Sequence, residues 1–214
     1  MITFLKATIF TFFLSVCVTH TFGQRIGISS DKLDSVVMNF VKELQSNGVD
    51  TICVYTHFYD GRTFGVETES RCSDYSMIFV PTYILWISNG KTFLHKKDNC
   101  YDYDTIEIDA QIVWDVFIKY QHQIKEEKVK VFEYKCENEC YIKIDVHSYV
   151  RKFSIYIEDK IIKMWFYDLN MKKESDGYKN INYSYNQKLK GTILVDKLEE
   201  LIKGIEKKNI LIVN

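Results

Sequence analysis

Two dipeptides favour tight hairpin turns in this chain and so constrain its fold. Asp60-Gly61 and Asn89-Gly90 stand between runs rich in β-branched and aromatic residues. Asn-Gly and Asp-Gly readily adopt the positive backbone angles that two-residue hairpin loops require. The runs that would flank these turns span residues 51–58, 63–69, 77–88 and 91–96. The pattern predicts antiparallel strands, with Pro81 at an edge position or a bulge.

The second half of the chain predicts a meander of further strands. Apolar and polar residues alternate over 142–147 and again over 153–157, which is typical of strands with one buried and one exposed face. The run 161–167 is almost continuously apolar and favours a central strand covered on both sides. Residues 181–189 are a candidate for one more strand.

Three amphipathic stretches carry apolar residues at helical spacing. The first starts at Ser30, a candidate N-cap, and stops at the Asn-Gly pair at 47–48. The second spans about residues 109–125 and the third is centred on 195–205. We therefore expect an α+β fold: mainly antiparallel β-sheet, in hairpins and a meander, packed with about three amphipathic helices. Because no linker rich in Pro, Gly or Ser interrupts the chain, residues 24–214 are expected to form a single domain.

The N-terminus has the layout of a secretory signal peptide. One early cation, Lys6, precedes an apolar run at 7–18 and a small-residue stretch that ends at Gly23. The run is shorter than the roughly 20 residues that a membrane-spanning helix needs, so we expect residues 1–23 to be removed. The mature chain would then be secreted or periplasmic and would hold no transmembrane segment. A lipid anchor at Cys17 is the alternative, although a branched residue precedes this cysteine where the lipoprotein signal wants a small one.

Five cysteines remain after this cleavage: Cys53, Cys72, Cys100, Cys136 and Cys140. An odd number in an oxidising compartment implies disulfides and one unpaired thiol. Cys53 lies inside an apolar run and is interpreted as a free buried thiol. Cys136 and Cys140 lie at a hairpin tip, which predicts a disulfide between them and leaves Cys72 and Cys100 as the second pair by elimination. The alternative for the tip is a metal site completed by His147, but zinc sites usually show a second close pair of ligands.

Composition excludes several functional classes. The 29 acidic residues nearly balance the 28 basic ones, so we expect no nucleic-acid partner. Only nine glycines are present, and none forms a phosphate-binding loop between a strand and a helix. No cofactor is expected. One proline and 15% aromatic residues indicate a folded, β-containing domain and not a disordered chain.

The acidic segment 98–109 is the most suggestive candidate for chemistry. Its oxygen ligands suit calcium, but the glycine and the closing glutamate of a standard calcium loop are absent. We interpret these acids as loop and helix-capping residues and assign no metal ligand. No catalytic residue is assigned either, because no serine or cysteine lies in a recognisable catalytic signature. The alternative is a hydrolase, with or without a metal, that combines His95 with Asp102 and Asp104.

The functional expectation is an exported, non-catalytic binding or interaction protein whose partner is a protein or a carbohydrate. The many tyrosines and tryptophans of the β-rich runs could present an aromatic surface, since these side chains combine apolar area with a polar tip. Two alternatives stay open: the extracytoplasmic hydrolase, and an envelope-associated structural component if Cys17 is lipidated.

Overall fold

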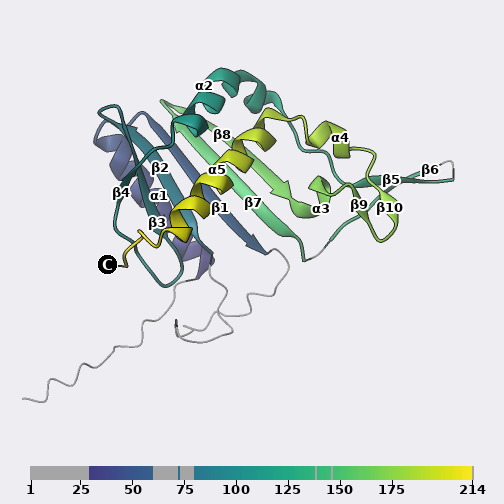
Figure 1. Ribbon diagram of the computed structural model, residues 1–214, viewed down its shortest axis with the longest axis horizontal. Helices are drawn as coiled ribbons and strands as arrows, with labels where there is room; N and C mark the ends of the chain where they lie inside the picture. Colours follow the sequence, from purple (N-terminus) through teal and green to yellow (C-terminus); the bar gives the residue numbers. More distant parts are fainter. Residues whose placement is uncertain (1–28, 60–71, 73–79, 138, 146, 214) are drawn as a thin grey trace, which may run out of the picture.

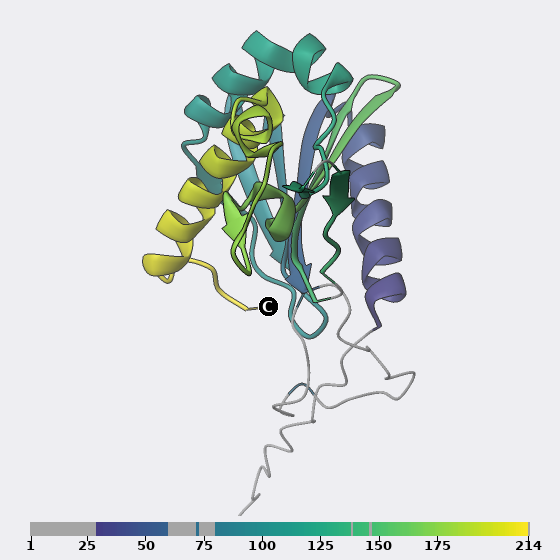
Figure 2. The ribbon, with the colours of Figure 1, turned by 90° about the vertical axis from the view of Figure 1, so that its right-hand side faces the viewer.

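The computed structural model describes residues 29–59, 72, 80–137, 139–145 and 147–213. It has the expected α+β fold, in which a six-stranded antiparallel sheet lies between layers of helices (Figures 1 and 2). The strand order is β4-β3-β2-β1-β7-β8. The strands are β1 (Thr51–Tyr59), β2 (Thr82–Ser88), β3 (Lys91–Lys97), β4 (Ile106–Ile108), β7 (Tyr149–Ile157) and β8 (Lys160–Tyr167).

Three long helices cover the two faces of this sheet. Helix α1 (Ser30–Ser46) packs on one face, and helices α2 (Gln111–Glu126) and α5 (Lys190–Lys207) pack on the other (Figure 2). They correspond to the three amphipathic stretches of the sequence. None of the helices in the described part of the chain is long and apolar enough to cross a membrane.

Strand β1 separates two hydrophobic cores. It pairs with β2 along one edge and with β7 along the other. Since successive strand residues point to opposite faces, Ile52 packs in the core beneath α1, whereas Cys53 and Tyr55 pack in the core beneath α2 and α5. Alternate residues of β1 therefore contact different helices: one set packs against α1 and the other against α2 and α5.

Helix α1 begins one residue earlier than predicted, because its N-cap is Ser29 and not Ser30. Ser29 is the N-cap, and its side chain accepts a hydrogen bond from the Lys32 N–H at 3.4 Å, whereas Ser30 is already helical. The helix ends as expected, where Gly48 has φ +80°, a conformation that costs glycine little.

The start of helix α5 is fixed by a carboxylate from outside the helix. Glu127 accepts hydrogen bonds from the N–H groups of Lys190 (2.8 Å) and Gly191 (2.9 Å). These are donors that a helix cannot satisfy internally. A Cβ at Gly191 would overlap the Met164 side chain of β8, so the missing side chain lets the helix approach the sheet closely.

The hairpin predicted at Asn89-Gly90 is confirmed. Both residues have positive φ angles, +51° and +73°, and they join β2 to β3. Pro81 precedes β2 instead of lying within it, so it needs neither an edge position nor a bulge. The Asp60-Gly61 turn and the run 63–69 lie outside the described residues.

The prediction that residues 161–167 form a central strand is wrong. Strand β8 is the edge of the sheet, and Ile161 and Trp165 are 50% and 42% exposed. Only alternate residues, such as Met164 and Phe166, are buried beneath the helices. A nearly continuous apolar run can thus bury one face and leave the other open.

Two further strand predictions in the second half are also wrong. Of the described residues 142–145 and 147, only Ile142 is in a strand, because the hairpin of β5 (Glu133–Cys136) and β6 (Glu139–Ile142) projects from the body (Figure 1). Here Ile142 and Ile144 are 61% and 80% exposed, so neither has the buried face that the alternation predicted. Residues 181–189 contain a short helix instead of a strand. The remaining short elements are α3 (Asp168–Met171), β9 (Glu174–Ser175), β10 (Tyr178–Lys179) and α4 (Tyr183–Asn186).

The cysteines are arranged differently from the prediction at one place. Cys72 and Cys100 are joined by a disulfide, and Cys53 is a buried free thiol. Cys136 and Cys140 are both exposed and are not joined. The hairpin register places Cys136 opposite Glu139 and Cys140 opposite Lys135, so the two cysteines lie on adjacent rungs and point to opposite faces. A bridge would require the register to slip by one residue.

Candidate functional site

A polar, tyrosine-rich site lies on the sheet face beneath α5. Five residues form it, and we call them the sheet site: Tyr55 and His57 of β1, Tyr83 of β2, and Tyr149 and Arg151 of β7. Tyr55 is directly opposite Tyr83, and His57 is directly opposite Arg151. Antiparallel neighbours that face each other share one face of the sheet, which brings these residues together from separate strands.

Helix α5 presents a row of charged residues to the sheet site. Asp196, Glu199, Lys203 and Glu206 follow one another at intervals of three and four, so they share one side of the helix. The apolar residues Leu198 and Ile202 lie beside this row and are buried in the core. The apolar stripe of α5 therefore packs in the core, and its charged row contacts the sheet site.

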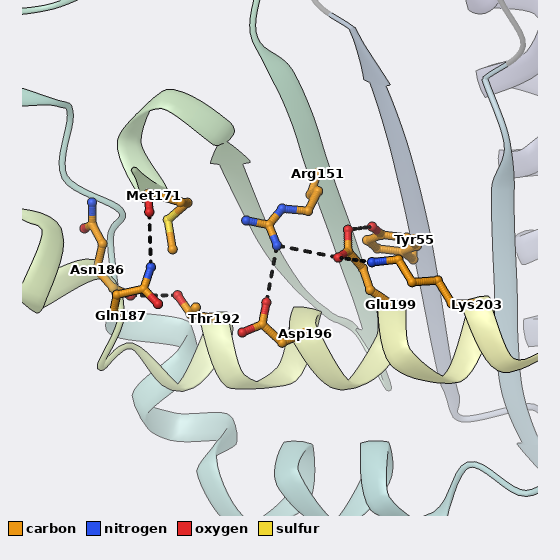
Figure 3. Close-up of polar contacts among 9 residues, drawn as sticks. All are labelled: Tyr55, Arg151, Met171, Asn186, Gln187, Thr192, Asp196, Glu199 and Lys203. Atoms are coloured by element: carbon orange, nitrogen blue, oxygen red, sulfur yellow. Dashed lines mark hydrogen bonds and ion pairs between the residues drawn. The ribbon is translucent and has the colours of Figure 1, made fainter. Parts of the chain in front are cut away.

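A hydrogen-bonded network joins the helix to two strands (Figure 3). The Tyr55 hydroxyl donates to Glu199 Oε1 at 2.8 Å, and Arg151 Nη1 lies 3.9 Å from Glu199 Oε2. The same Arg151 nitrogen donates to Asp196 Oδ1 at 3.3 Å, and Lys203 Nζ donates to Glu199 at 3.3 Å. The Arg151 side chain is only 11% exposed, so its charge is held by these two carboxylates and not by water.

A second set of contacts surrounds Glu206. The hydroxyl of Tyr83 donates to Glu206 Oε1 at 2.5 Å, and Lys96 Nζ donates to the same atom at 2.8 Å. Burial alone would raise the pKa of Glu206, but the hydrogen bonds from Lys96 and Tyr83 outweigh it and lower that pKa. Glu206 is therefore a carboxylate that accepts hydrogen bonds.

The ionised groups in and around the sheet site balance. Three cations, Lys96, Arg151 and Lys203, face three carboxylates of α5. The pKa of His57 is lowered, chiefly by burial, although Glu199 and Glu206 act in the opposite direction. A neutral histidine adds no charge, so the site offers no net attraction to an anion or a cation.

Two buried nitrogen atoms of the sheet site have no hydrogen-bond partner in the described part of the chain. They are His57 Nδ1 and Arg151 Nε, and their residues face each other across β1 and β7. A buried polar atom without a partner costs about 1–3 kcal/mol. The fold thus leaves two unmet hydrogen bonds at one place on the sheet.

A series of aromatic rings leads from these nitrogens to the surface. The His57 ring lies 5.6 Å from the ring of Tyr149, which lies 5.2 Å from the ring of Tyr59. Tyr59 is 48% exposed, Tyr149 is half-buried, and Tyr55 and Tyr83 are fully buried behind them. Burial raises the pKa of Tyr55, Tyr83 and Tyr149, so their hydroxyls stay protonated and can donate hydrogen bonds.

The acidic segment 98–109 is not part of the sheet site, and its Asp98 and Asp109 side chains accept hydrogen bonds from nearby backbone N–H groups. Asp98 accepts hydrogen bonds from the N–H groups of Cys100 (2.8 Å) and Tyr101 (2.7 Å). Asp109 accepts one from the N–H of Gln111 at the start of α2 (3.2 Å). These contacts agree with the loop and helix-capping interpretation.

The histidine and one acid of the predicted hydrolase are brought together. His95 Nε2 is 2.8 Å from Asp102 Oδ1, and His95 Nδ1 is 3.3 Å from the Thr105 hydroxyl. Asp102 also binds Lys97, whereas the backbone N–H of Asp104 donates to Ile212. Burial lowers the pKa of His95 against the opposing effect of Asp102. Across the described residues, no three His, Cys, Asp or Glu side chains gather as metal ligands, and the free thiols Cys136 and Cys140 are not part of such a group.

A groove of about 420 Å³ lies between α5 and the segment that links β4 to α2. Ile108, Leu201 and Ile205 form its apolar part, and its rim carries both acids and lysines. Most of the lining side chains are exposed, and none of its polar atoms is buried without a partner. The groove therefore shows less evidence of a ligand than the sheet site does.

Sequence reasoning missed the sheet site because its members are far apart in the chain. Tyr55 and Glu199 are separated by 144 positions. One local signal was present: Arg151 is an arginine inside an otherwise β-forming run, and a buried arginine needs carboxylates from another element. Comparisons with protein-family models, with curated proteins and with solved structures give no match for this chain, so its own geometry is the basis for assigning a function.

Proposed function

We propose that the protein is an exported, non-catalytic binding protein that holds an uncharged, hydroxyl-rich ligand of the carbohydrate class. The ligand would lie on Tyr59 and Tyr149 and reach the sheet site behind them. The observation that carries this proposal is the pair of partnerless nitrogens, His57 Nδ1 and Arg151 Nε, whose residues lie two positions along the strands from the Tyr59–Tyr149 pair.

The chemistry around these nitrogens favours a neutral ligand. The neighbouring ionised groups already balance, so a charged ligand would leave one charge unpaired. Sugar rings combine an apolar C–H face, which packs on an aromatic ring, with hydroxyls that both donate and accept hydrogen bonds. A hydroxyl of a sugar that packs on Tyr59 and Tyr149 would give these two nitrogens a partner.

The same contacts favour binding over catalysis. A general base must be available to take a proton from the reacting group. Glu199 is occupied by Tyr55 and Lys203, and Glu206 by Tyr83 and Lys96. The His95–Asp102 contact supports a hydrolase less well, because Lys97 shares the Asp102 carboxylate with His95.

We propose a secreted or periplasmic location for the mature chain. The Cys72–Cys100 disulfide is of a kind that persists in oxidising compartments, and the apolar run near the N-terminus has the length of a signal peptide core. Intact-mass analysis of the protein from its own host should give a chain that starts at Gln24. Reduction should raise its mass by the two hydrogens that each opened disulfide takes up. A chain that keeps Met1 with every cysteine reduced would contradict this location, and added lipid mass on Cys17 would indicate the anchored form.

Titration with four soluble oligosaccharides tests the ligand class. We expect at least one of maltotetraose, cellotetraose, xylotetraose and chitotetraose to bind by isothermal titration calorimetry, at concentrations up to about 10 mM. Tyr149→Ala should weaken that binding by about tenfold or more, because a central aromatic contact typically contributes more than 1 kcal/mol.

A tyrosine from another surface provides the matched control. Tyr141 is 43% exposed, close to the 48% of Tyr59, but it belongs to the β5–β6 hairpin, which projects from the body and is not part of the six-stranded sheet (Figure 1). Tyr59→Ala should weaken binding, whereas Tyr141→Ala should change it by less than about twofold. The proposal fails if no sugar binds, or if Tyr141→Ala weakens binding as much as Tyr59→Ala does.

A further inference from the structure

The outer edge of β8 has no strand beside it in the part of the chain that the structure describes. Strand β8 pairs only with β7, whose other edge is taken by β1. It is eight residues long and contains no proline, so its backbone is a regular template for another strand.

The turn between β7 and β8 fixes which backbone groups face outwards. Ile157 and Lys160 are directly opposite each other across the two turn residues Glu158 and Asp159. The pair that closes a two-residue hairpin loop exchanges hydrogen bonds, and such pairs alternate along the ladder. Lys160 and every second residue after it therefore bond to β7, whereas the N–H and C=O groups of residues 161, 163 and 165 point away from the sheet.

The same three residues expose their side chains. Ile161 and Trp165 are 50% and 42% exposed, and Lys163 between them is exposed as well. The described core beneath α1 contains residues of β1, β2 and β7 but none of β8, so this half of the sheet face is not covered by the helix. Free backbone groups and uncovered side chains thus coincide along one edge.

The charged side chains of the strands at this edge are positive, and the acids Glu158 and Asp159 lie in the turn at its end. Lys160 and Lys163 lie on β8, and Lys152 of β7 places its Nζ 4.9 Å above the ring of Trp165. Among the residues that the structure describes, none of these three lysines has a carboxylate partner. Opposite charges on facing strand positions stabilise pairing, so an acidic segment complements this edge.

We infer that the β8 edge is a docking site for an extended, acidic segment of a partner protein, which adds to the sheet as a seventh strand. Its carboxylate would face Lys163, and apolar side chains two residues to either side would face Ile161 and Trp165. Backbone hydrogen bonds to residues 161, 163 and 165 would supply affinity, and the alternate side chains would supply specificity.

The lysines also disfavour a second copy of the same chain as the occupant. An antiparallel pairing of two β8 strands centred on Lys163 would place this lysine directly opposite the same residue of the other copy. Like charges at facing positions are destabilising, and lysines on an edge strand are a common protection against self-association. An acidic partner segment would not be repelled by these lysines.

A synthetic heptapeptide tests the docking site. The probe is acetyl-Thr-Val-Thr-Glu-Thr-Val-Thr-amide, which places glutamate between two valines on one face. We expect saturable binding by fluorescence anisotropy of a labelled form, with slowed amide exchange at Ile161, Lys163 and Trp165. A version with lysine in place of glutamate, and a version N-methylated on alternate amides, should bind at least about tenfold more weakly.

A charge reversal supplies the matched pair of variants. Lys163→Glu should weaken binding of the glutamate peptide by about tenfold and should improve binding of the lysine peptide, because the facing charge is inverted. Lys173→Glu makes the same change at an exposed site off the strand and should alter binding by less than about twofold. Both substitutions are at exposed positions, so circular dichroism should show an unchanged fold.

Three results would overturn the inference. The first is equal binding of the N-methylated peptide, which would exclude strand addition. The second is equal effects of Lys163→Glu and Lys173→Glu. The third is a concentration-dependent dimer in sedimentation experiments that protects the Ile161, Lys163 and Trp165 amides without any peptide, which would assign the edge to a second copy of the chain.

Discussion

Asn186→Ala is expected to lower the free energy of unfolding by about 2–4 kcal/mol, because both backbone groups of Lys130 would lose their partner and each such loss costs about 1–3 kcal/mol when buried, whereas the Asn170 carbonyl would keep Asn180. Asn186 has no exposed surface. Its Oδ1 accepts from the Lys130 N–H at 2.9 Å, and its Nδ2 donates to the carbonyls of Lys130 and Asn170, both at 2.8 Å. One side chain thus ties the segment after α2 to α3 and α4, and urea denaturation followed by circular dichroism measures the loss.

A second asparagine of the same region is the control for this prediction. Asn182 also donates to the segment after α2, through the Val131 carbonyl (3.0 Å) and the Glu133 carboxylate (3.1 Å), but it is only partly buried. Water can replace these bonds, so Asn182→Ala should cost about 1 kcal/mol or less. Equal losses for Asn182→Ala and Asn186→Ala would show that burial does not set the cost.

The fold class and the long helices could be predicted because their signals are local. The amphipathic stripes of α1, α2 and α5 lie within 20 residues each, and Asn89-Gly90 specifies its own backbone angles. Such patterns depend on a residue's immediate neighbours. They are readable before any tertiary contact is known.

The order and coverage of the strands could not be predicted, because they depend on the rest of the fold. The sequence of residues 161–167 does not indicate that β8 is an edge strand. Its apolar residues on the exposed face, Ile161 and Trp165, would be equally compatible with a position covered by a further strand or helix. The Cys136–Cys140 prediction failed for a related reason. A two-residue loop and a three-residue loop at that tip differ by one step of register, and that step turns one cysteine to the opposite face.

The candidate site was harder to predict from the sequence than the fold was. The acidic segment 98–109 attracted attention because its acids are adjacent, and adjacency is common in loops and helix caps. The sheet site instead needs the register of β1, β2 and β7 together with the facing side of α5. Only the placement of Arg151 within a β-forming run hinted that distant carboxylates would be required.

Arg151→Ala is expected to lower the free energy of unfolding by about 2–4 kcal/mol, since it removes a largely buried guanidinium and leaves Glu199 with only the exposed Lys203 as its cation. The Glu199 side chain is 17% exposed, so water screens it poorly once Arg151 is removed. The guanidinium also packs 5.8 Å from the centre of the Phe166 ring, and that packing would be lost as well. Denaturant unfolding measures the change.

Lys203→Ala is the matched comparison, because Lys203 pairs with the same Glu199 carboxylate at 3.3 Å but is 74% exposed. Exposed pairs are worth about 0–1 kcal/mol, so this variant should be close to the unmodified protein in stability. The double replacement of Arg151 by Met and Glu199 by Leu should recover part of the loss, since the charge and its partner leave together. If Arg151→Ala costs no more than Lys203→Ala, then water reaches the guanidinium, and its Nε atom is not a buried group that a ligand would need to satisfy.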